Sequence, residues 1–387
     1  MRVLNFLNTK YRTLFGSKLF ISPIDESREY LESFPHPRDN IERSYFQYRC
    51  QMLPFPKFKR FIFHVISCPI LVYYLLKTFF QEKPIFKYNA EALLLFGGSI
   101  EIVPKSLAVE YYILQIPDFQ QRIALTKGDR AFIRKLIKRY PFYWYFIFKC
   151  TLKIAMFSYL IQSYSPKALI CSEEYSFTSS VLTDYCEELD IVHINIMHGE
   201  KLFNITDSFF QFNRFYLWDE FYKDLFIELR AEPSQFIIEC PPIMLPWEIR
   251  NIKKSIDYTY YLEGIEDELT LVSIRNTLFP FCNAGFNVAI RPHPNGLNLN
   301  KVKEKFFDME IEDIKNIGIK ESILRTHHVI SIYSTVHLQA LANNIPIIID
   351  DITRPDVFNK LQELKYICLQ KEHSLLSMEL PFGSKRM

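Results

Sequence analysis

The chain has 387 residues, of which 49% are hydrophobic and 23% are charged, and its formal net charge is +2. This ordinary globular composition and length predict two domains, and the small net charge excludes a protein built to coat nucleic acid. The eight cysteines form no CxxC pair and the first residues lack the apolar core of a signal peptide, so we expect reduced thiols in a cytoplasmic protein.

Residues 1–90 are punctuated by prolines and predict irregular chain, apart from one apolar segment at 61–80. That segment is long enough to span a membrane, but His64, Pro69 and Lys77 interrupt it. We expect a buried or interface-lying helix there, with a membrane-spanning helix as the alternative.

A basic and aromatic helix is predicted over 129–164, with Asp129 as its N-cap and a kink or break at Pro141. Its first turns carry Arg130, Arg134, Lys135, Lys138 and Arg139. This pattern is typical of a solvated face on a core helix. It is also typical of a surface that docks on anionic lipid, together with the segment 57–80.

From residue 167 onwards, short apolar strands alternate regularly with helices, as in a parallel sheet with right-handed crossovers. A buried strand followed by a Gly-Gly turn is expected within 91–103. Further strands are expected at 167–172, 192–199 and 236–243, a helix at 177–190, and a strand leading into a helix within 215–229.

A proline-rich linker at 240–257 precedes a second alternation of strands and helices. Its expected strands are 258–262, 286–294, 328–334 and 346–350, and its expected helices are 266–283 and 335–344. We therefore predict an α/β fold with two Rossmann-like, doubly wound parallel-sheet domains, 1–245 and 246–387, that face a cleft.

Polar groups follow the predicted strands, and ligands of open parallel sheets bind at the carboxyl ends of strands. In the first domain these groups are Glu173 and Glu174 after one strand and His198 after the next. In the second domain they are Glu263, Gly264, Arg291, His293, Ser334 and Thr335. Their joint placement predicts a ligand site.

The RPHP segment at 291–294 follows a strand of the second domain, and its prolines restrict the backbone beside Arg291 and His293. Such a fixed turn suits a phosphate, although an ordinary loop with one salt bridge would have the same sequence. Ser334 and Thr335 stand where a strand turns into a helix, so they predict an anion site, a simple N-cap, or both.

The ordered set MHGEKL, YYLEG, RPHP and YST…ALANNIPII, within 165–350, resembles bacterial GT-B glycosyltransferases of surface polysaccharide. One similar group is the sialyltransferases and polysialyltransferases that use CMP-sialic acid. The resemblance implies that His293 and Pro294 belong to the donor-phosphate motif, and that Ser334 and Thr335 belong to the Ser/Thr motif. The acidic-acidic-Gly motif of that group is not matched, because Tyr175 follows Glu173–Glu174.

The other similar group is the CDP-glycerol glycerophosphotransferases, which pair an HG motif with an RxHP motif. The resemblance implies that His198 and Gly199 are the HG pair. The run that follows this pair in the group is Thr-Pro-Leu-Lys-like, whereas this chain has Glu200, Lys201 and Leu202.

The sequence thus predicts an inverting, metal-independent GT-B glycosyltransferase of capsule polysaccharide or lipopolysaccharide biosynthesis, with a cytidine-activated donor such as CMP-sialic acid. His198, Glu173 or Glu174 would be the catalytic base, and the second domain would stabilise the leaving phosphate. Asp350 and Asp351 favour a solvated loop or a ribose contact over a metal site.

We expect no cofactor beyond the nucleotide-sugar donor, a glycan or lipid-linked acceptor, no nucleic acid, and a peripheral position on the anionic inner face of the plasma membrane. One alternative is a CDP-glycerol glycerophosphotransferase-like polymerase. The other is a non-catalytic subunit of a capsule assembly complex.

Overall fold

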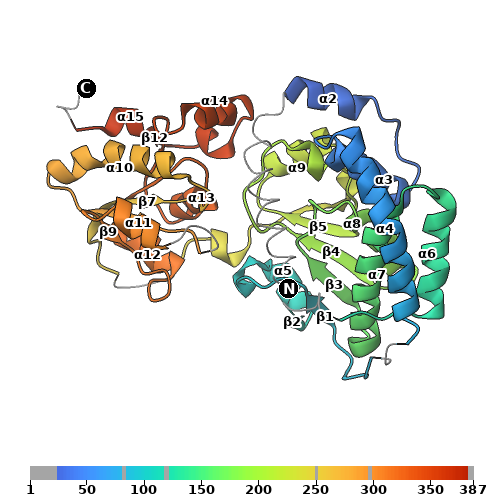
Figure 1. Ribbon diagram of the computed structural model, residues 1–387. Coiled ribbons are helices and arrows are strands. Elements are labelled where there is room, and N and C mark those ends of the chain that lie inside the picture. The colour runs from blue at the N-terminus through green and yellow to red at the C-terminus, as the bar shows by residue number, and fades with distance from the viewer. Residues whose placement is uncertain (1–23, 81–83, 117–121, 249–251, 295–298, 382–387) are drawn as a thin grey trace. The chain divides into compact units, whose positions relative to one another are not determined.

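The computed structural model describes residues 24–80, 84–116, 122–248, 252–294 and 299–381, in two compact units (Figure 1). Among these residues the first domain ends at Pro242 and the second begins at Ile243, within the proline-rich linker.

The first domain is built on a six-stranded parallel sheet in the order β2-β1-β3-β4-β5-β6. The inner strands β1, β3, β4 and β5 are largely buried, as in parallel sheets covered by helices, whereas the edge strands β2 and β6 are partly exposed. The strands are β1 Ala92–Leu94, β2 Ile113–Gln115, β3 Ala168–Cys171, β4 Val192–Ile196, β5 Arg214–Leu217 and β6 Phe236–Ile238. The α-helices are α2 Ile24–Glu32, α3 Asn40–Met52, α4 Lys57–Lys77, α5 Lys105–Glu110, α6 Lys127–Arg139, α7 Trp144–Tyr164, α8 Ser179–Glu187 and α9 Glu220–Glu228.

The second domain holds a second six-stranded parallel sheet, in the order β12-β11-β10-β7-β8-β9. Its strands are β7 Ile256–Tyr261, β8 Val288–Arg291, β9 Glu310–Ile311, β10 Thr326–Ser331, β11 Ile347–Ile349 and β12 Ser374–Leu375. Its α-helices are α10 Glu268–Asn283, α11 Leu299–Lys305, α12 Ile319–Arg325, α13 Thr335–Ala342, α14 Pro355–Glu363 and α15 Leu376–Glu379. The predicted fold class, α/β with two doubly wound parallel-sheet domains, is confirmed.

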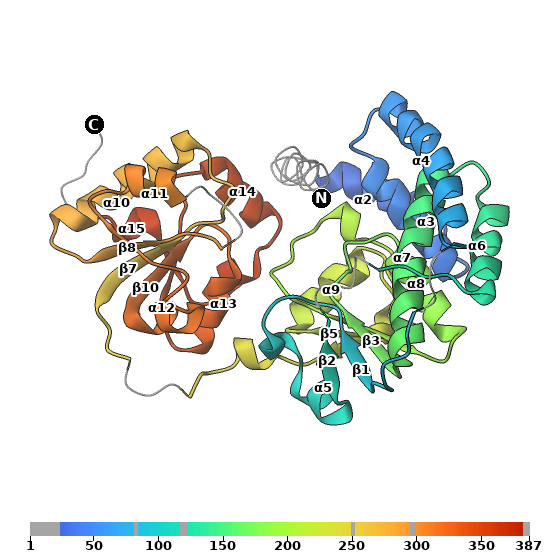
Figure 2. The ribbon, with the colours of Figure 1, turned by 60° about the horizontal axis from the view of Figure 1, so that its bottom comes forward.

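Each sheet reverses its strand order once, and that point is where doubly wound domains bind ligands. In the first sheet the reversal lies between β1 and β3, which pair side by side (Figure 2). In the second it lies between β7 and β10, which gives the strand order 3-2-1-4-5-6 of dinucleotide-binding domains.

The prediction of irregular chain before residue 61 is wrong, because α2 and α3 occupy most of the described part of it, whereas the helix expected at 61–80 is present as α4. The prolines lie between these helices rather than inside them, except for Pro69 in α4. Asp39 caps α3 by accepting the backbone N–H of Glu42 at 2.9 Å. The prolines therefore mark helix boundaries, which the sequence pattern alone did not distinguish from loops.

The predicted break at Pro141 is confirmed, since α6 ends at Arg139 and α7 begins at Trp144. The predicted N-cap, Asp129, is wrong. Thr126 is the N-cap of α6, and Asp129 is the third helical residue of a capping box that bonds back to the backbone of Thr126.

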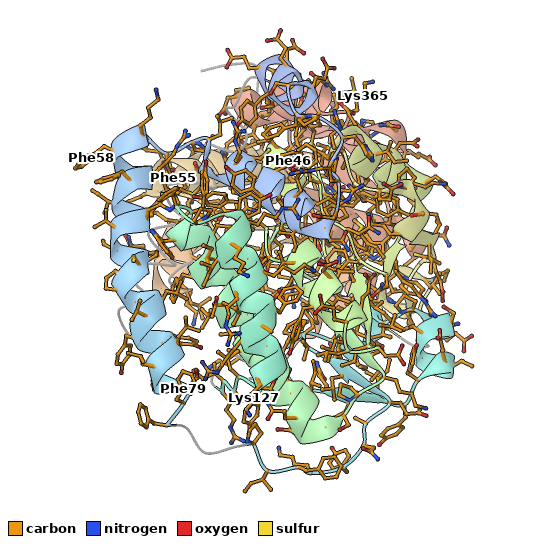
Figure 3. The ribbon with its side chains drawn as sticks, turned by 90° about the vertical axis from the view of Figure 1, so that its right-hand side faces the viewer. Phe46, Phe55, Phe58, Phe79, Lys127 and Lys365 are labelled. Atoms are coloured by element: carbon orange, nitrogen blue, oxygen red, sulfur yellow. The ribbon has the colours of Figure 1, made fainter. Side chains whose placement is uncertain are left out.

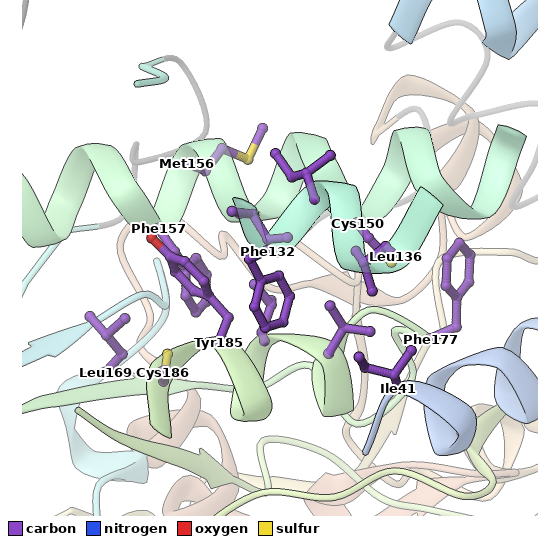
Figure 4. Close-up of a cluster of buried hydrophobic side chains, with 14 of the residues drawn as sticks. Ile41, Phe132, Leu136, Cys150, Met156, Phe157, Leu169, Phe177, Tyr185 and Cys186 are labelled. Atoms are coloured by element: carbon purple, nitrogen blue, oxygen red, sulfur yellow. The ribbon is translucent and has the colours of Figure 1, made fainter. Parts of the chain in front are cut away.

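The core of the first domain lies between the sheet and helices α6, α7 and α8 (Figure 4). Phe132 of α6, Cys150 and Phe157 of α7 and Tyr185 of α8 are buried there together. The helix α7 is therefore a core helix. The eight cysteines are unpaired, and most are buried.

Candidate functional site

The loops after β3 and β4 bring the three predicted catalytic residues to one edge of the first sheet. The two strands pair in parallel with Cys171 opposite Asn195, so their carboxyl ends lie side by side. Ser172, Glu173 and Glu174 leave β3, and His198 follows β4.

His198 is held in a defined tautomer by Ser172. The hydroxyl of Ser172 donates to the backbone carbonyl of Ile196 at 2.7 Å, and its oxygen also bonds to Nδ1 of His198. Because a hydroxyl has a single hydrogen, Nδ1 is the protonated nitrogen and donates to Ser172. The other ring nitrogen, Nε2, therefore carries a lone pair. The ring of Phe96, from the loop after β1, lies 5.7 Å from the imidazole between centroids.

The imidazole of His198 is neutral at neutral pH. Burial lowers its pKa below the ordinary value, Glu174 opposes that shift, and Lys201 adds to it. A neutral histidine with a bare Nε2 can accept a proton. The surroundings of His198 therefore favour a role as general base.

Glu174 is a buried carboxylate that stays ionised. Lys201 forms an ion pair with it, and the amide of Asn195 donates to its Oε2 at 2.9 Å. Burial alone would raise the pKa of Glu174, but the charge of Lys201 and the hydrogen bonds from Lys201 and Asn195 oppose burial, and the pKa is lowered to about 2. Because Glu174 takes up no proton near neutral pH, it is suited to electrostatic stabilisation of His198.

Lys201 is also near a second carboxylate. Burial lowers the pKa of Lys201, but Glu174 and then Asp207 outweigh it and raise the pKa above its ordinary value. Burial raises the pKa of Asp207 to about 6, against the opposing charge of Lys201. The ammonium group therefore stays charged and neutralises this buried acidic corner.

Glu173 is anchored by two groups from other elements. Lys153 of α7 donates to its Oε1, and its backbone N–H donates to Oδ1 of Asn195 at 2.8 Å. Both predicted carboxylates are thus engaged in ion pairs. Sequence reasoning missed Lys153, Asn195 and Lys201, and the one available signal was the polar Asn195 near the carboxyl end of β4.

In the second domain, Glu263 and Gly264 follow β7. Gly264 has φ of +85°, and the carboxylate of Glu266 accepts its backbone N–H at 2.8 Å and also that of Glu263. Burial, and then the nearby Glu266, raise the pKa of Glu263 to about 7, and Arg354 at 3.8 Å opposes them. Glu263 therefore changes its charge near neutral pH.

Arg291 is buried at the end of β8. Its Nη1 lies 2.8 Å from Oε2 of Glu312, and its Nη2 donates to the carbonyl of Ile317 at 3.1 Å. The guanidinium is thus committed to contacts within the domain, while His293 and Pro294 are exposed. Phosphate binding by this segment stays a prediction.

Ser334 is the N-cap of α13, and its hydroxyl oxygen accepts the backbone N–H of Val336 at 3.2 Å. Thr335 is the first residue of that helix. Since β7 and β10 flank the strand-order reversal, Ser334–Thr335 and Glu263–Gly264 follow its two strands.

The acidic pair after β11 is used for local structure. Asp350 is buried and accepts the hydroxyl of Tyr260 at 2.7 Å and the backbone N–H of Ile352 at 2.9 Å. Asp351 accepts the backbone N–H of Ser377 at 2.9 Å. These contacts fix the loop after β11.

Comparisons with protein-family models and with curated proteins found no match. Among solved structures, the chain is similar to UDP-GlcNAc 2-epimerase from Neisseria meningitidis bound to UDP-GlcNAc, with 12% identity and a TM-score of 0.45 over 76% of this chain and 96% of that one. It is similar to the calicheamicin glycosyltransferase CalG4, with 9% identity and a TM-score of 0.43 over 74% and 85%. It is also similar to a variant of the wall teichoic acid polymerase TagF, with 10% identity and a TM-score of 0.37 over 68% of this chain and 70% of that one. At these low scores the likenesses carry no argument about function.

Proposed function

We propose that the chain is a glycosyltransferase that moves a sugar from a cytidine-activated donor, CMP-sialic acid or a related sugar, to a surface glycan. The observation that carries this proposal is the neutral His198 with a bare Nε2 at the carboxyl edge of the first sheet. A sugar transfer needs such a base beside the acceptor hydroxyl.

In this proposal Nε2 of His198 accepts the proton of the acceptor hydroxyl as the hydroxyl oxygen bonds to the donor's anomeric carbon. The bond from that carbon to the donor phosphate breaks on the opposite side, so the configuration inverts. The imidazolium that forms is stabilised by the ionised Glu174, whose charge raises the pKa of His198. Ser172 is a positioning residue, and no metal takes part.

The second domain would hold the donor at its strand-order reversal. The start of α13, with Ser334 and Thr335, offers backbone N–H groups to a phosphate. The exposed His293 and Pro294 add the phosphate contact that the resemblance implies, and Arg291 supports their turn through Glu312. Glu263 and Gly264 would line the nucleotide.

A ligand panel and a turnover assay test this proposal together. We expect CMP or CDP to raise the melting temperature more than UDP or GDP, since ligand at about 100 times its Kd adds about 2.7 kcal/mol. We expect His198→Asn to lower the transfer rate strongly while keeping nucleotide binding. His327→Asn changes an exposed histidine of the second domain and is the matched control.

The competing functions give different outcomes. Turnover of CDP-glycerol but not of CMP-sugars would assign the glycerophosphotransferase function. Cytidine nucleotide binding without turnover of any donor, in the presence of glycan or lipid-linked acceptors, would assign a non-catalytic subunit. A clear preference for UDP would overturn the cytidine donor.

A further inference from the structure

Helix α4 presents a long apolar face to solvent. Only Ser67 and Leu71 of its 21 residues are buried. Phe58 is 72% exposed, and Phe61 and Tyr73 are each 64% exposed. The other exposed large apolar residues of the helix are Val65, Ile66, Ile70, Val72 and Leu76. Figure 3 shows α4 at the margin of the first domain, with Phe58 and Phe79 near its two ends.

The opposite face of α4 is fixed to the first domain. Phe63 and Leu75 pack against the core between the sheet and the helices. His64 bonds through Nε2 to the hydroxyl of Tyr48 at 3.0 Å, and its Nδ1 accepts the backbone N–H of Tyr145 at 3.3 Å. The exposed face is therefore held in place as a surface of the folded domain.

The charges of this segment are of one sign and stand at the ends of the helix. Residues 53–80 contain no Asp or Glu. Lys57, Lys59 and Arg60 lie in the first turn and Lys77 ends the helix, so residues 61–76 carry neither acids nor lysine or arginine. An apolar face between basic ends is complementary to the acyl chains and the anionic headgroups of a lipid surface.

The start of α6 extends the basic rim at the far end of α4. The guanidinium of Arg130 lies 3.5 Å from the ring centroid of Phe79, and its Nη2 donates to the hydroxyl of Thr78 at 2.9 Å. Further along α6, Lys135 pairs with Glu188, and Arg139 pairs with Asp39. The basic residues of α6 thus fall into two groups. Arg130 lies beside the end of α4, whereas Lys135 and Arg139 are held in ion pairs further along the helix.

We propose that the exposed face of α4 docks the first domain on an anionic lipid bilayer, with the helix lying in the plane of the interface. By length and composition alone, α4 and α7 are the helices among the described residues that could cross a membrane. However, α7 is largely buried in the core, and α4 is anchored along its inner side. Crossing the bilayer would strip α4 from that core, whereas lying on the surface requires no rearrangement.

Flotation of the full chain with phosphatidylglycerol vesicles and with phosphatidylcholine vesicles tests this proposal. We expect flotation with the anionic vesicles at low salt and a loss of at least tenfold in binding for Phe61→Ser/Val65→Ser/Tyr73→Ser. The control, Val109→Ser/Leu269→Ser/Phe307→Ser, removes apolar residues elsewhere that are even more exposed, and it should float like the wild type. Lys57→Glu/Lys59→Glu should lower binding and its dependence on salt.

Several outcomes would overturn the proposal. Absence of flotation with anionic vesicles would do so, as would equal binding by the α4 variant and its control. Loss of a wild-type dimer in the α4 variant, without flotation of either protein, would assign the face to self-association. Binding that survives carbonate extraction would assign α4 as a spanning helix. Circular dichroism establishes that each variant is folded.

Discussion

Glu174 and Glu263 are buried at the carboxyl edges of the two sheets, and their pKa values are shifted in opposite directions. In the first domain Glu173 and Glu174 each face a lysine, and the pKa of Glu174 is lowered to about 2. In the second domain Glu263 lies beside another carboxylate, Glu266, and its pKa is raised to about 7. At the first edge Glu174 therefore stays ionised beside the neutral His198, whereas at the second edge Glu263 changes its charge near neutral pH.

The largest expected effect follows from removing the base of the first edge. His198→Asn should lower the transfer rate about 10³-fold, equivalent to about 4 kcal/mol, because no other group takes the acceptor proton. Rates at saturating donor, measured with thermal melts, check this. A folded variant with near-wild-type turnover would contradict the assignment of His198.

The next effect concerns the fixed charges. Lys201→Met leaves the buried carboxylate of Glu174 without its counter-ion and should destabilise the first domain by about 3–4 kcal/mol in urea unfolding. The double variant Glu174→Gln/Lys201→Met should recover most of that loss. Lys167→Met breaks an exposed ion pair with Glu91 and should cost under about 1 kcal/mol. Equal losses for the two lysine variants would show that burial of the pair is irrelevant.

We expect Glu263, at the carboxyl edge of the second sheet, to make the free energy of unfolding depend on pH. The pKa of Glu263 is raised from 4.5 to about 7, so between these values the unfolded chain is ionised while the folded chain keeps its proton. Stability is then lost as pH rises through this window, by about 3 kcal/mol in full, and the loss persists above it. Glu263→Gln should lack this loss, while Glu321→Gln, at an exposed position, should follow the wild type. Parallel profiles for all three proteins would rule out a raised pKa.

The smallest effect tests the tautomer of His198. Ser172→Ala removes the oxygen that accepts the Nδ1 proton and should lower kcat about tenfold with little change in KM, and it should shift the acidic limb of the pH profile. Ser172→Thr keeps the hydroxyl and should restore most of the rate. A rate loss without a shift of the pH profile would indicate a purely structural role.

Much of the fold could be predicted because its strands are short apolar runs, such as 167–172 and 346–350, bounded by polar residues. Helices α2 and α3 were missed because their apolar residues cover one face only and prolines flank them, whereas the helix at 61–80 was expected. The strand ends could likewise be predicted, so the sequence alone placed Glu174 and His198 at the carboxyl edge of the first sheet. Their partners could not be predicted, because Lys153 meets Glu173 only through the packing of α7, and Lys201 meets Glu174 only through the loop after β4.

The contacts of Arg291 could not be predicted from the sequence either. Its position beside two prolines suited a phosphate contact, yet its guanidinium meets Glu312, which lies 21 residues further along the chain. A salt bridge formed by a distant residue leaves no local pattern, whereas the exposure of the neighbouring His293 fits the turn that the prolines predict.

Helix α7 connects two features of the first domain. One of its faces packs against α4, and Lys153, on the same helix, reaches Glu173 at the edge of the sheet. If α4 rests on a bilayer, this rigid rod sets the height of His198 above the lipid. The protein would then act on acceptor groups that stand at one fixed distance from their membrane anchor. It would meet these acceptors by diffusing along the membrane surface.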